Sequence, residues 1–191
     1  MTVHDVLTVG HPILRQPARD VAPEAIGEPE VQRLIGDLVD TMRHAQGAGL
    51  AAPQIGVPLR VAVIEVRDNP RYPYKPNIPL TVLVNPTIEP IGDETVDINE
   101  GCLSVPDLRG TVARHVTVRV RYRDQHAAVQ DEVKRGLTAG TFQHECDHLD
   151  GRLFLDRVTD PTTFTTWAQF ERFHRDAFVA RISAFVARVG S

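Results

Sequence analysis

The residues best suited to chemistry form the run His-Glu-Cys-Asp-His at positions 144–148. On a helix each residue turns by about 100°, so the imidazoles of His144 and His148 lie about 40° apart and one turn from each other. Both can then bind one metal ion, and Glu145 projects beside them, where it can handle a proton of metal-bound water. Cys146 lies about 200° round from His144, so we expect a buried packing thiol there. The alternative for the whole run is a surface helix with two titrating histidines.

A catalytic metal site of this kind usually has three protein ligands and water, so one ligand must come from elsewhere in the chain. A metzincin would need a third histidine at position 154, which is Phe154 here. A thermolysin-like site would use an acidic residue further on, and Glu171 fits that description. Cys102 is the other strong donor, in an irregular Gly- and Pro-flanked segment at 100–106. The residues alone leave Cys102 and Glu171 open as ligands, and Cys102 also open as a core residue.

Three segments have the spacing of amphipathic helices, and one of them carries the histidines. The first, about 30–46, has a single apolar stripe formed by Val31, Leu34, Ile35, Leu38 and Met42. The second spans about 137–149 and stops at Gly151. The third spans about 162–189 and contains five of the seven phenylalanines, which indicates core or dimer packing.

Strands are expected between the first and second helices. Residues 59–66 and 80–89 are rich in Val, Leu and Ile, as strands are. Prolines recur every third residue from Pro70 to Pro79 between them, and we expect a stiff surface connection there. Strands in the middle of the chain and helices towards its ends indicate an α+β fold.

Two further segments have distinctive patterns. Residues 112–123 alternate between apolar and polar side chains, less regularly before Val116, and we expect a solvated face that carries the arginines at 119, 121 and 123. Contact of these arginines with nucleic acid is the alternative. Residues 47–56 contain three glycines and a proline, which predicts a loop where the backbone comes close to another group.

The composition is that of an ordinary globular protein. The chain has 191 residues, of which 42% are hydrophobic and 24% charged, and its length suits one domain. A net charge of −4 argues against general nucleic-acid binding. The sequence shows neither a signal peptide nor a run of apolar residues long enough to span a membrane, so we expect a cytoplasmic protein. Its two cysteines are then expected to be free thiols or metal ligands.

Three segments closely resemble the signature motifs of the peptide deformylases, in the order of that family. They are GAGLAAPQ at 47–54, EGCLS at 100–104 and QHECDH at 143–148. The opening VGHPILRQPA is also similar, with His11 where Asp is commoner in the family. The similarity covers about residues 5–160. It implies an α+β fold in which antiparallel strands pack around a central helix carrying HExxH, with N-terminal and C-terminal helices. We expect one catalytic domain, 1–191, with its core at about 5–160 and a C-terminal helical extension at about 161–191.

The resemblance implies a role for each matching residue. Cys102, His144 and His148 would hold the metal, which favours Cys102 over Glu171. Glu145 would be the general base and then the general acid. The Gln54 side-chain amide and the Leu103 backbone N–H would donate to the developing oxyanion, and Gly49 would pair its backbone with the substrate. The family uses Fe²⁺, for which Zn²⁺, Ni²⁺ or Co²⁺ can substitute, whereas the ligand types alone suggest zinc first.

The substrate pocket is expected along one face of the second helix. Leu137, Gly140 and Thr141 share the face of the two histidines, and Gly140 would leave space for an apolar side chain such as that of methionine. Family position adds Ile98 to this pocket, and Ala48 and Gly101 to the substrate-binding residues. A pair between Arg114 and Asp147 is expected to brace the helix, with a plain surface ion pair as the alternative.

The implied function is metal-dependent removal of the N-formyl group from the terminal methionine of new polypeptides. The alternatives are a thermolysin-like metallopeptidase that uses Glu171, and a metal-dependent binding or redox-sensing module. Some family members dock on the ribosome through the C-terminal helix, and here four arginines lie in that segment at 172, 175, 181 and 188. Ribosome contact is therefore a further expectation.

Overall fold

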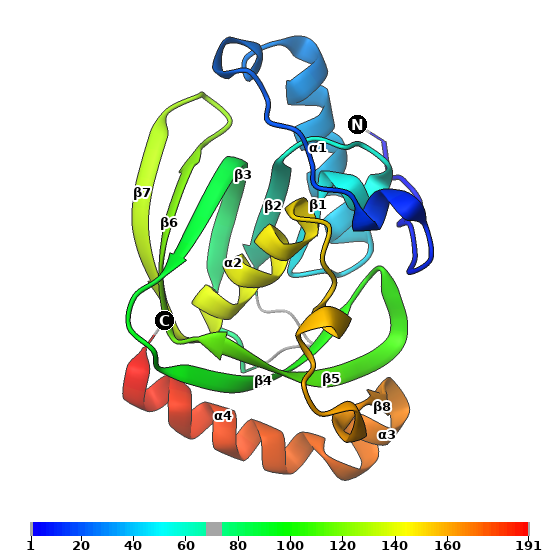
Figure 1. The fold of residues 1–191 in the computed structure, drawn as a ribbon, viewed down its shortest axis with the longest axis vertical. Coiled ribbons are helices and arrows are strands. Elements are labelled where there is room, and N and C mark those ends of the chain that lie inside the picture. The colour runs from blue at the N-terminus through cyan, green and yellow to red at the C-terminus, as the bar shows by residue number, and fades with distance from the viewer. Residues whose placement is uncertain (1, 68–73, 191) are drawn as a thin grey trace.

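A computed structural model describes residues 2–67 and 74–190. Within these residues, two antiparallel sheets and three α-helices surround a fourth, central α-helix (Figure 1). The five-stranded sheet has the order β1-β2-β3-β6-β7 and the three-stranded sheet the order β4-β5-β8. The predicted α+β class with antiparallel strands is therefore confirmed.

The first helix and the first long strands lie where the sequence predicts them. Helix α1 spans Pro29–His44, β2 spans Val61–Val66 and β3 spans Ile78–Pro90. Every residue of β2 is buried because both of its faces are covered. Ala62 and Ile64 belong to the core cluster that includes residues of α2, whereas Val61 and Val63 pack in the cluster that includes those of α1.

Residues 47–56 differ from the predicted loop. Gly49–Ala51 form the short strand β1, which is antiparallel to β2 with Gly49 opposite Ile64, and Ala52–Ile55 form a 3-10 helix. The strand character comes from pairing with β2, which the local composition does not reveal. The expected close approach of backbone to another group is present, and it is described with the site.

The alternating segment 112–123 is divided between two strands. Strand β5 spans Val105–His115 and pairs with β4, Thr95–Cys102; strand β6 spans Thr117–Arg123 and pairs with β3 and with β7, Val129–Arg135. The chain changes sheets at Val116, where the alternation is imperfect. Arg119 and Arg121 are exposed and pair with Asp131, as a solvated face requires. The Pro70–Pro79 segment lies partly outside the described residues.

Helix α2 spans Gly136–Leu149, close to the predicted bounds, and nearly all of its side chains are buried. It lies across one face of the five-stranded sheet, and β4 and β5 lie on its other side (Figure 1). Gly151 follows in the left-handed region, at a φ of +71°. The position of α2 between the two sheets places the HExxH run in the middle of the molecule.

The prediction of one continuous helix over 162–189 is wrong. The chain forms the short strand β8 at Thr165–Thr166, then α3 at Trp167–Phe173 and α4 at Arg175–Val189, with the break at His174. Strand β8 pairs with β5, and this contact holds the chain extended where the apolar spacing predicts a helix. Three of the five phenylalanines in this segment do form core, because Phe170, Phe178 and Phe185 pack with Ile98 and Leu137, whereas Phe173 is exposed.

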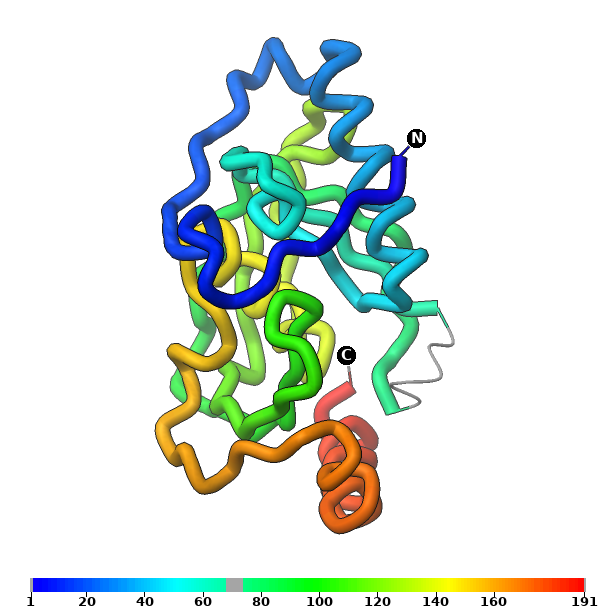
Figure 2. Tube along the Cα trace, turned by 90° about the vertical axis from the view of Figure 1, so that its right-hand side faces the viewer, coloured from blue at the N-terminus to red at the C-terminus, as the bar shows by residue number. Residues whose placement is uncertain are grey.

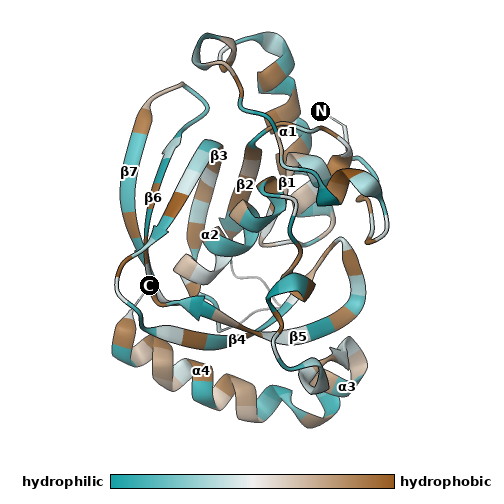
Figure 3. Cartoon of the chain, viewed as in Figure 1, coloured by the Kyte–Doolittle hydropathy of each residue, from teal (hydrophilic) through white to brown (hydrophobic). Residues whose placement is uncertain are grey.

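Helix α4 covers the end of the molecule opposite to the N-terminus (Figure 2). Apolar and polar residues are interleaved along it, and its apolar side chains join the cluster under β4 (Figure 3). None of the helices in the described ranges has the length and apolar character needed to span a membrane.

Candidate active site

Three metal-binding side chains meet between α2 and the end of β4. Cys102 is the last residue of β4, and its Sγ lies 3.3 Å from Nε2 of His148. The rings of His144 and His148 stand edge to face, with centroids 5.0 Å apart. One ligand atom from each of the three residues lies within 4.8 Å of the others, and this is the one such group found in residues 2–67 and 74–190.

The donor set fits a metal ion. A tetrahedral ion about 2.3 Å from a thiolate and about 2.0 Å from an imidazole nitrogen separates these donors by about 3.5 Å, close to the observed contact between Cys102 and His148. Nδ1 of His144 lies 2.9 Å from a Glu100 carboxylate oxygen. A carboxylate at Nδ1 favours the tautomer whose Nε2 lone pair is available to a metal. A thiolate with two imidazoles suits Zn²⁺ or Fe²⁺.

Glu145 lies beside this group and is buried, with 4% of its surface exposed. Its Oε2 has no hydrogen-bond partner among the described residues. Burial raises the pKa of Glu145 to about 7, and the charges of His144 and Lys75 act in the opposite direction. A carboxyl group with its pKa raised in this way can take up and release a proton near neutral pH.

The backbone of β1 approaches Glu145 at Gly49. A Cβ at position 49 would lie 2.4 Å from Glu145 Oε1, so any side chain there would displace the carboxylate. This is the close backbone approach that the glycine-rich segment predicts.

A buried network of ion pairs supports the metal-binding group through contacts with His144 and with helix α2. The Arg114 guanidinium donates to both carboxylate oxygens of Glu100, at 2.7 and 2.9 Å, and to Asp147 at 2.6 Å. Arg157 donates to the other oxygen of Asp147 at 2.6 Å. Burial raises the pKa of the Glu100 carboxyl, but Arg114 and His144 outweigh it and hold that pKa well below its usual range. The expected pair between Arg114 and Asp147 is present and buried, so the surface alternative is excluded.

Gln54 points its side-chain amide at the same centre from the 3-10 helix after β1. Its Nε2 donates to Ser104 Oγ at 3.1 Å and to Cys102 Sγ at 3.6 Å, and its Oε1 accepts from the Ala51 N–H at 2.8 Å. Gln54 is 2% exposed, so these bonds fix its orientation. Leu103 follows Cys102 directly and lines the same cavity.

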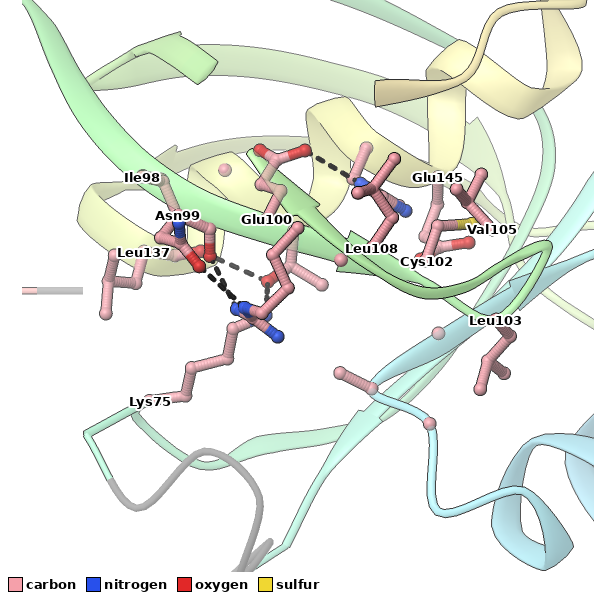
Figure 4. Close-up of a pocket in the computed structure, with 18 of the residues that line it drawn as sticks. Lys75, Ile98, Asn99, Glu100, Cys102, Leu103, Val105, Leu108, Leu137 and Glu145 are labelled. Carbon is pink, nitrogen blue, oxygen red and sulfur yellow. Dashed lines mark hydrogen bonds and ion pairs between the residues drawn. The ribbon is translucent and has the colours of Figure 1, made fainter. Parts of the chain in front are cut away.

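The cavity in front of the group has a volume of about 490 Å³ (Figure 4). All of the predicted substrate-binding residues line it: Ala48, Gly49, Ile98, Gly101, Leu137 and Thr141. The space at Gly140 is taken by Ile98, since a Cβ there would lie 2.5 Å from Ile98 Cδ1.

Several residues of the cavity wall are not predicted by any pattern in the sequence. Lys75 reaches Thr141 Oγ1 at 3.2 Å, which makes one end of the pocket polar. Asn99, Arg109 and Trp167 line another part. Asn99 was detectable as a neighbour of the EGCLS motif, but no local pattern marks Lys75 or Trp167.

Glu171, the alternative third ligand, is not part of the metal-binding group. It lies on α3, its side chain is 41% exposed, and its nearest charge is Arg175 at 3.5 Å. The geometry therefore favours Cys102.

Residues 3–164 match the family described as polypeptide deformylase. The chain belongs to the polypeptide deformylase family. Among related sequences, a peptide deformylase of Leptospira biflexa is 44% identical over 165 residues, which is 86% of this chain and 92% of that protein. Peptide deformylase 2 of Ralstonia nicotianae is 48% identical over 162 residues, 85% of this chain and 90% of that protein.

Solved structures of deformylases agree in fold. The Met-Ala-Ser-bound class I type b peptide deformylase of Acinetobacter baumannii superposes with a TM-score of 0.79 at 38% identity, over 82% of this chain and 99% of its own. The actinonin complex of the Synechococcus elongatus peptide deformylase has a TM-score of 0.74 at 35% identity and covers 94% of this chain and 88% of its own. The deformylase match over 3–164 ends before β8, so Trp167, α3 and α4 lie beyond it.

Proposed function

We propose that this chain is a metal-dependent peptide deformylase, which hydrolyses the N-formyl group of the terminal methionine on new polypeptides and releases formate. The observation that carries the proposal is the meeting of Cys102, His144 and His148 beside the buried Glu145 carboxylate, at the wall of an open cavity. Membership of the deformylase family supports the same reaction. We propose that the chain works as one catalytic domain, with its core at about 5–160.

We infer that Cys102, His144 and His148 hold one Fe²⁺ ion, for which Zn²⁺, Ni²⁺ or Co²⁺ can substitute. When bound, such an ion lowers the pKa of water and polarises the formyl carbonyl. The Glu100–Arg114–Asp147 network supports the ligands by fixing the ring of His144 and the turn of α2 that carries both histidines. Such supporting contacts usually affect metal affinity strongly.

The substrate is proposed to bind as an extended strand between the two sheets. β1 and β4 are edge strands of their sheets, so each has one edge that pairs with no strand in the described parts of the chain. Residues of both edges line the cavity, among them Gly49 on β1 and Gly101 on β4. A peptide backbone can add to such edges through main-chain hydrogen bonds. Gly49 is then placed to pair with the peptide, and Ala48 lies next to it.

The side chain of the first residue is proposed to enter the space between β4 and α2. Ile98 and Leu137 supply the apolar walls, and Thr141 with Lys75 forms a polar end. An unbranched side chain such as that of methionine suits this shape.

Glu145 is proposed to take a proton from the attacking water as its oxygen bonds to the formyl carbon. The same carboxyl then gives a proton to the nitrogen, the C–N bond breaks, and formate and a free amine leave. The amide of Gln54 and the backbone N–H of Leu103 donate to the carbonyl oxygen while it carries negative charge. The short distance between the amide of Gln54 and Cys102 supports this role.

The test is anaerobic purification, metal analysis and a formate assay with formyl-Met-Ala-Ser. We expect one metal ion per chain and steady formate release. Glu145→Gln should keep the metal and lower kcat by at least about 10²-fold, the usual effect of a positioned acid–base group. Formate release that survives this substitution would contradict the role given to Glu145.

We also propose that the C-terminal helices contact the ribosome and that the protein is cytoplasmic. Ribosome contact is supported by the arginines of α3 and α4, of which Arg172, Arg181 and Arg188 are exposed. Sedimentation with ribosomes should weaken when Arg172, Arg181 and Arg188 are replaced together by glutamine.

A further inference from the structure

Trp167 lines the same cavity as the metal-binding group, although it lies outside residues 3–164, the range that matches the family description. It is the first residue of α3 and is half-buried. The C-terminal extension therefore contributes a side chain to the cavity wall as well as covering the core.

Contacts with β5 fix the position of Trp167. Strand β8 places Thr165 opposite Arg109 and Thr166 opposite Leu108. The Thr166 side chain then caps α3, and the Trp167 backbone N–H donates to Asp107 Oδ1 at 3.2 Å. A residue held by strand pairing, a helix cap and a backbone hydrogen bond forms a fixed wall.

The indole lies on a buried guanidinium. The Arg109 Cζ is 4.3 Å from the centroid of the Trp167 ring, and Arg109 itself is 1% exposed. The guanidinium also donates to the Asn99 side chain and backbone, at 2.6 and 2.8 Å. A Cβ at Gly101 would lie 3.1 Å from Arg109 Nη1, so the arginine lies flat over β4. Trp167, Arg109 and Asn99 thus form one layer, which we call the tryptophan layer.

The tryptophan layer covers the face of β4 opposite to α2. Residues paired across strands share a face, so Gly101, Arg109 and Thr165 point the same way. Ile98 lies on the other face of β4, where it packs with Leu137 of α2. Figure 4 shows Ile98 and Asn99 further along β4 from Cys102.

A peptide extended along β4 points successive side chains to opposite faces. If the first side chain enters the pocket at Ile98 and Leu137, the second points to the tryptophan layer. We propose that Trp167 forms the wall of the subsite for the second residue of the substrate and favours aromatic and large apolar side chains there over glycine. This inference rests on the proposed deformylase function.

The first experiment compares kcat/KM for formyl-Met-Phe-Ser and formyl-Met-Gly-Ser. In the unmodified enzyme we expect a preference of about 3- to 10-fold for the phenylalanine substrate, the usual scale of one aromatic contact. Trp167→Ala should abolish the preference by raising KM for the phenylalanine substrate, with kcat unchanged. Trp167→Phe should retain most of it. The control is Phe173→Ala, which removes a ring that is 62% exposed on the same helix.

A preference that survives Trp167→Ala, or an equal loss of kcat with both substrates, would overturn the inference. A second measurement needs no variant, because Trp167 is the only tryptophan of the chain. Titration of the metal-loaded enzyme with the product Met-Phe-Ser should shift tryptophan emission more strongly, and at lower concentration, than titration with Met-Gly-Ser. Equal responses would also overturn it. Formate release from formyl-Met-Ala-Ser is measured in parallel, so that absence of the deformylase activity itself is recognised separately.

Discussion

Gly49 of β1 lies directly against the carboxylate of Glu145 on α2, so closely that a methyl group at position 49 would overlap Glu145 Oε1, Cδ and Cγ. Two elements far apart in the sequence therefore define the position of the acid–base group together. The atoms that would be displaced belong to the flexible end of a side chain, so the fold can accommodate the change while the carboxylate moves.

Gly49→Ala is accordingly expected to reduce kcat for formate release by about 10²-fold, since a displacement of about 1 Å at a reacting group costs this much. The melting temperature should change little. Gly36→Ala is the matched control, because Gly36 lies in α1 with nothing within 4 Å of the added methyl group. It should leave kcat unchanged and stabilise the helix by up to about 1 kcal/mol. Equal kcat values for the two variants would show that Gly49 does not position Glu145.

The metal content of two variants distinguishes the two candidates for the third ligand, Cys102 and Glu171. Cys102→Ala should strip the metal, because Cys102 Sγ lies 3.3 Å from His148 Nε2, close to the separation expected for two ligands of one ion. Glu171→Ala should retain it, since this exposed carboxylate pairs with Arg175. Metal analysis after gel filtration of each variant gives the answer. Full metal occupancy in the Cys102 variant would refute the proposed ligand set.

The periodic parts of the fold were predictable because their patterns are local. The stripe of Val31, Ile35 and Leu38 faces the core in α1 as a 3.6-residue period requires. The segment 162–189 has similar spacing, but the pairing of β8 with β5 depends on residues more than 50 positions away and overrides it. Strand β1 was missed for the same reason, since Gly49–Ala51 becomes a strand only beside β2.

In the candidate site, too, local patterns predict some residues, whereas others are placed only by contacts between distant parts of the chain. The helical spacing of His144 and His148 makes a shared metal predictable from one short run, whereas Cys102 joins them only through the fold, and its selection depended on the family resemblance. Trp167 carries no local sign of its place, because it reaches the cavity through the path of β8. Sequence periodicity cannot predict residues that line the cavity because distant strands pair.

The buried network behind the histidines is expected to matter for both stability and metal affinity. Arg114→Met leaves the buried Glu100 carboxylate without its guanidinium and should lower the free energy of unfolding by about 3–5 kcal/mol. Affinity for the metal should fall by about 10- to 100-fold, because Glu100 orients His144. Arg119→Met is the control, since Arg119 forms an ion pair on the surface with Asp131, and little change is expected. Denaturant titration and competition with a chelator measure the two effects; equal behaviour of the variants would contradict the assigned role.

Acid should weaken the contact between α1 and β2. Arg43 donates to both carboxylate oxygens of the buried Glu65, at 2.7 and 3.0 Å, and these hydrogen bonds lower the pKa of Glu65 below its usual 4.5. A carboxyl whose pKa is lower in the folded state stabilises the fold fully above its unfolded pKa, and this stabilisation is lost as the pH falls through the folded pKa. Arg43→Met should therefore lower the free energy of unfolding at pH 7, and the gap to the unmodified protein should narrow between about pH 5 and pH 3. Arg67, 2.9 Å from the same carboxylate, limits the size of the effect.

Urea titrations across this pH range measure the difference in free energy of unfolding, with Arg33→Met on the exposed side of α1 as control. A gap that stays constant with pH would show that the pair does not shift the titration of Glu65.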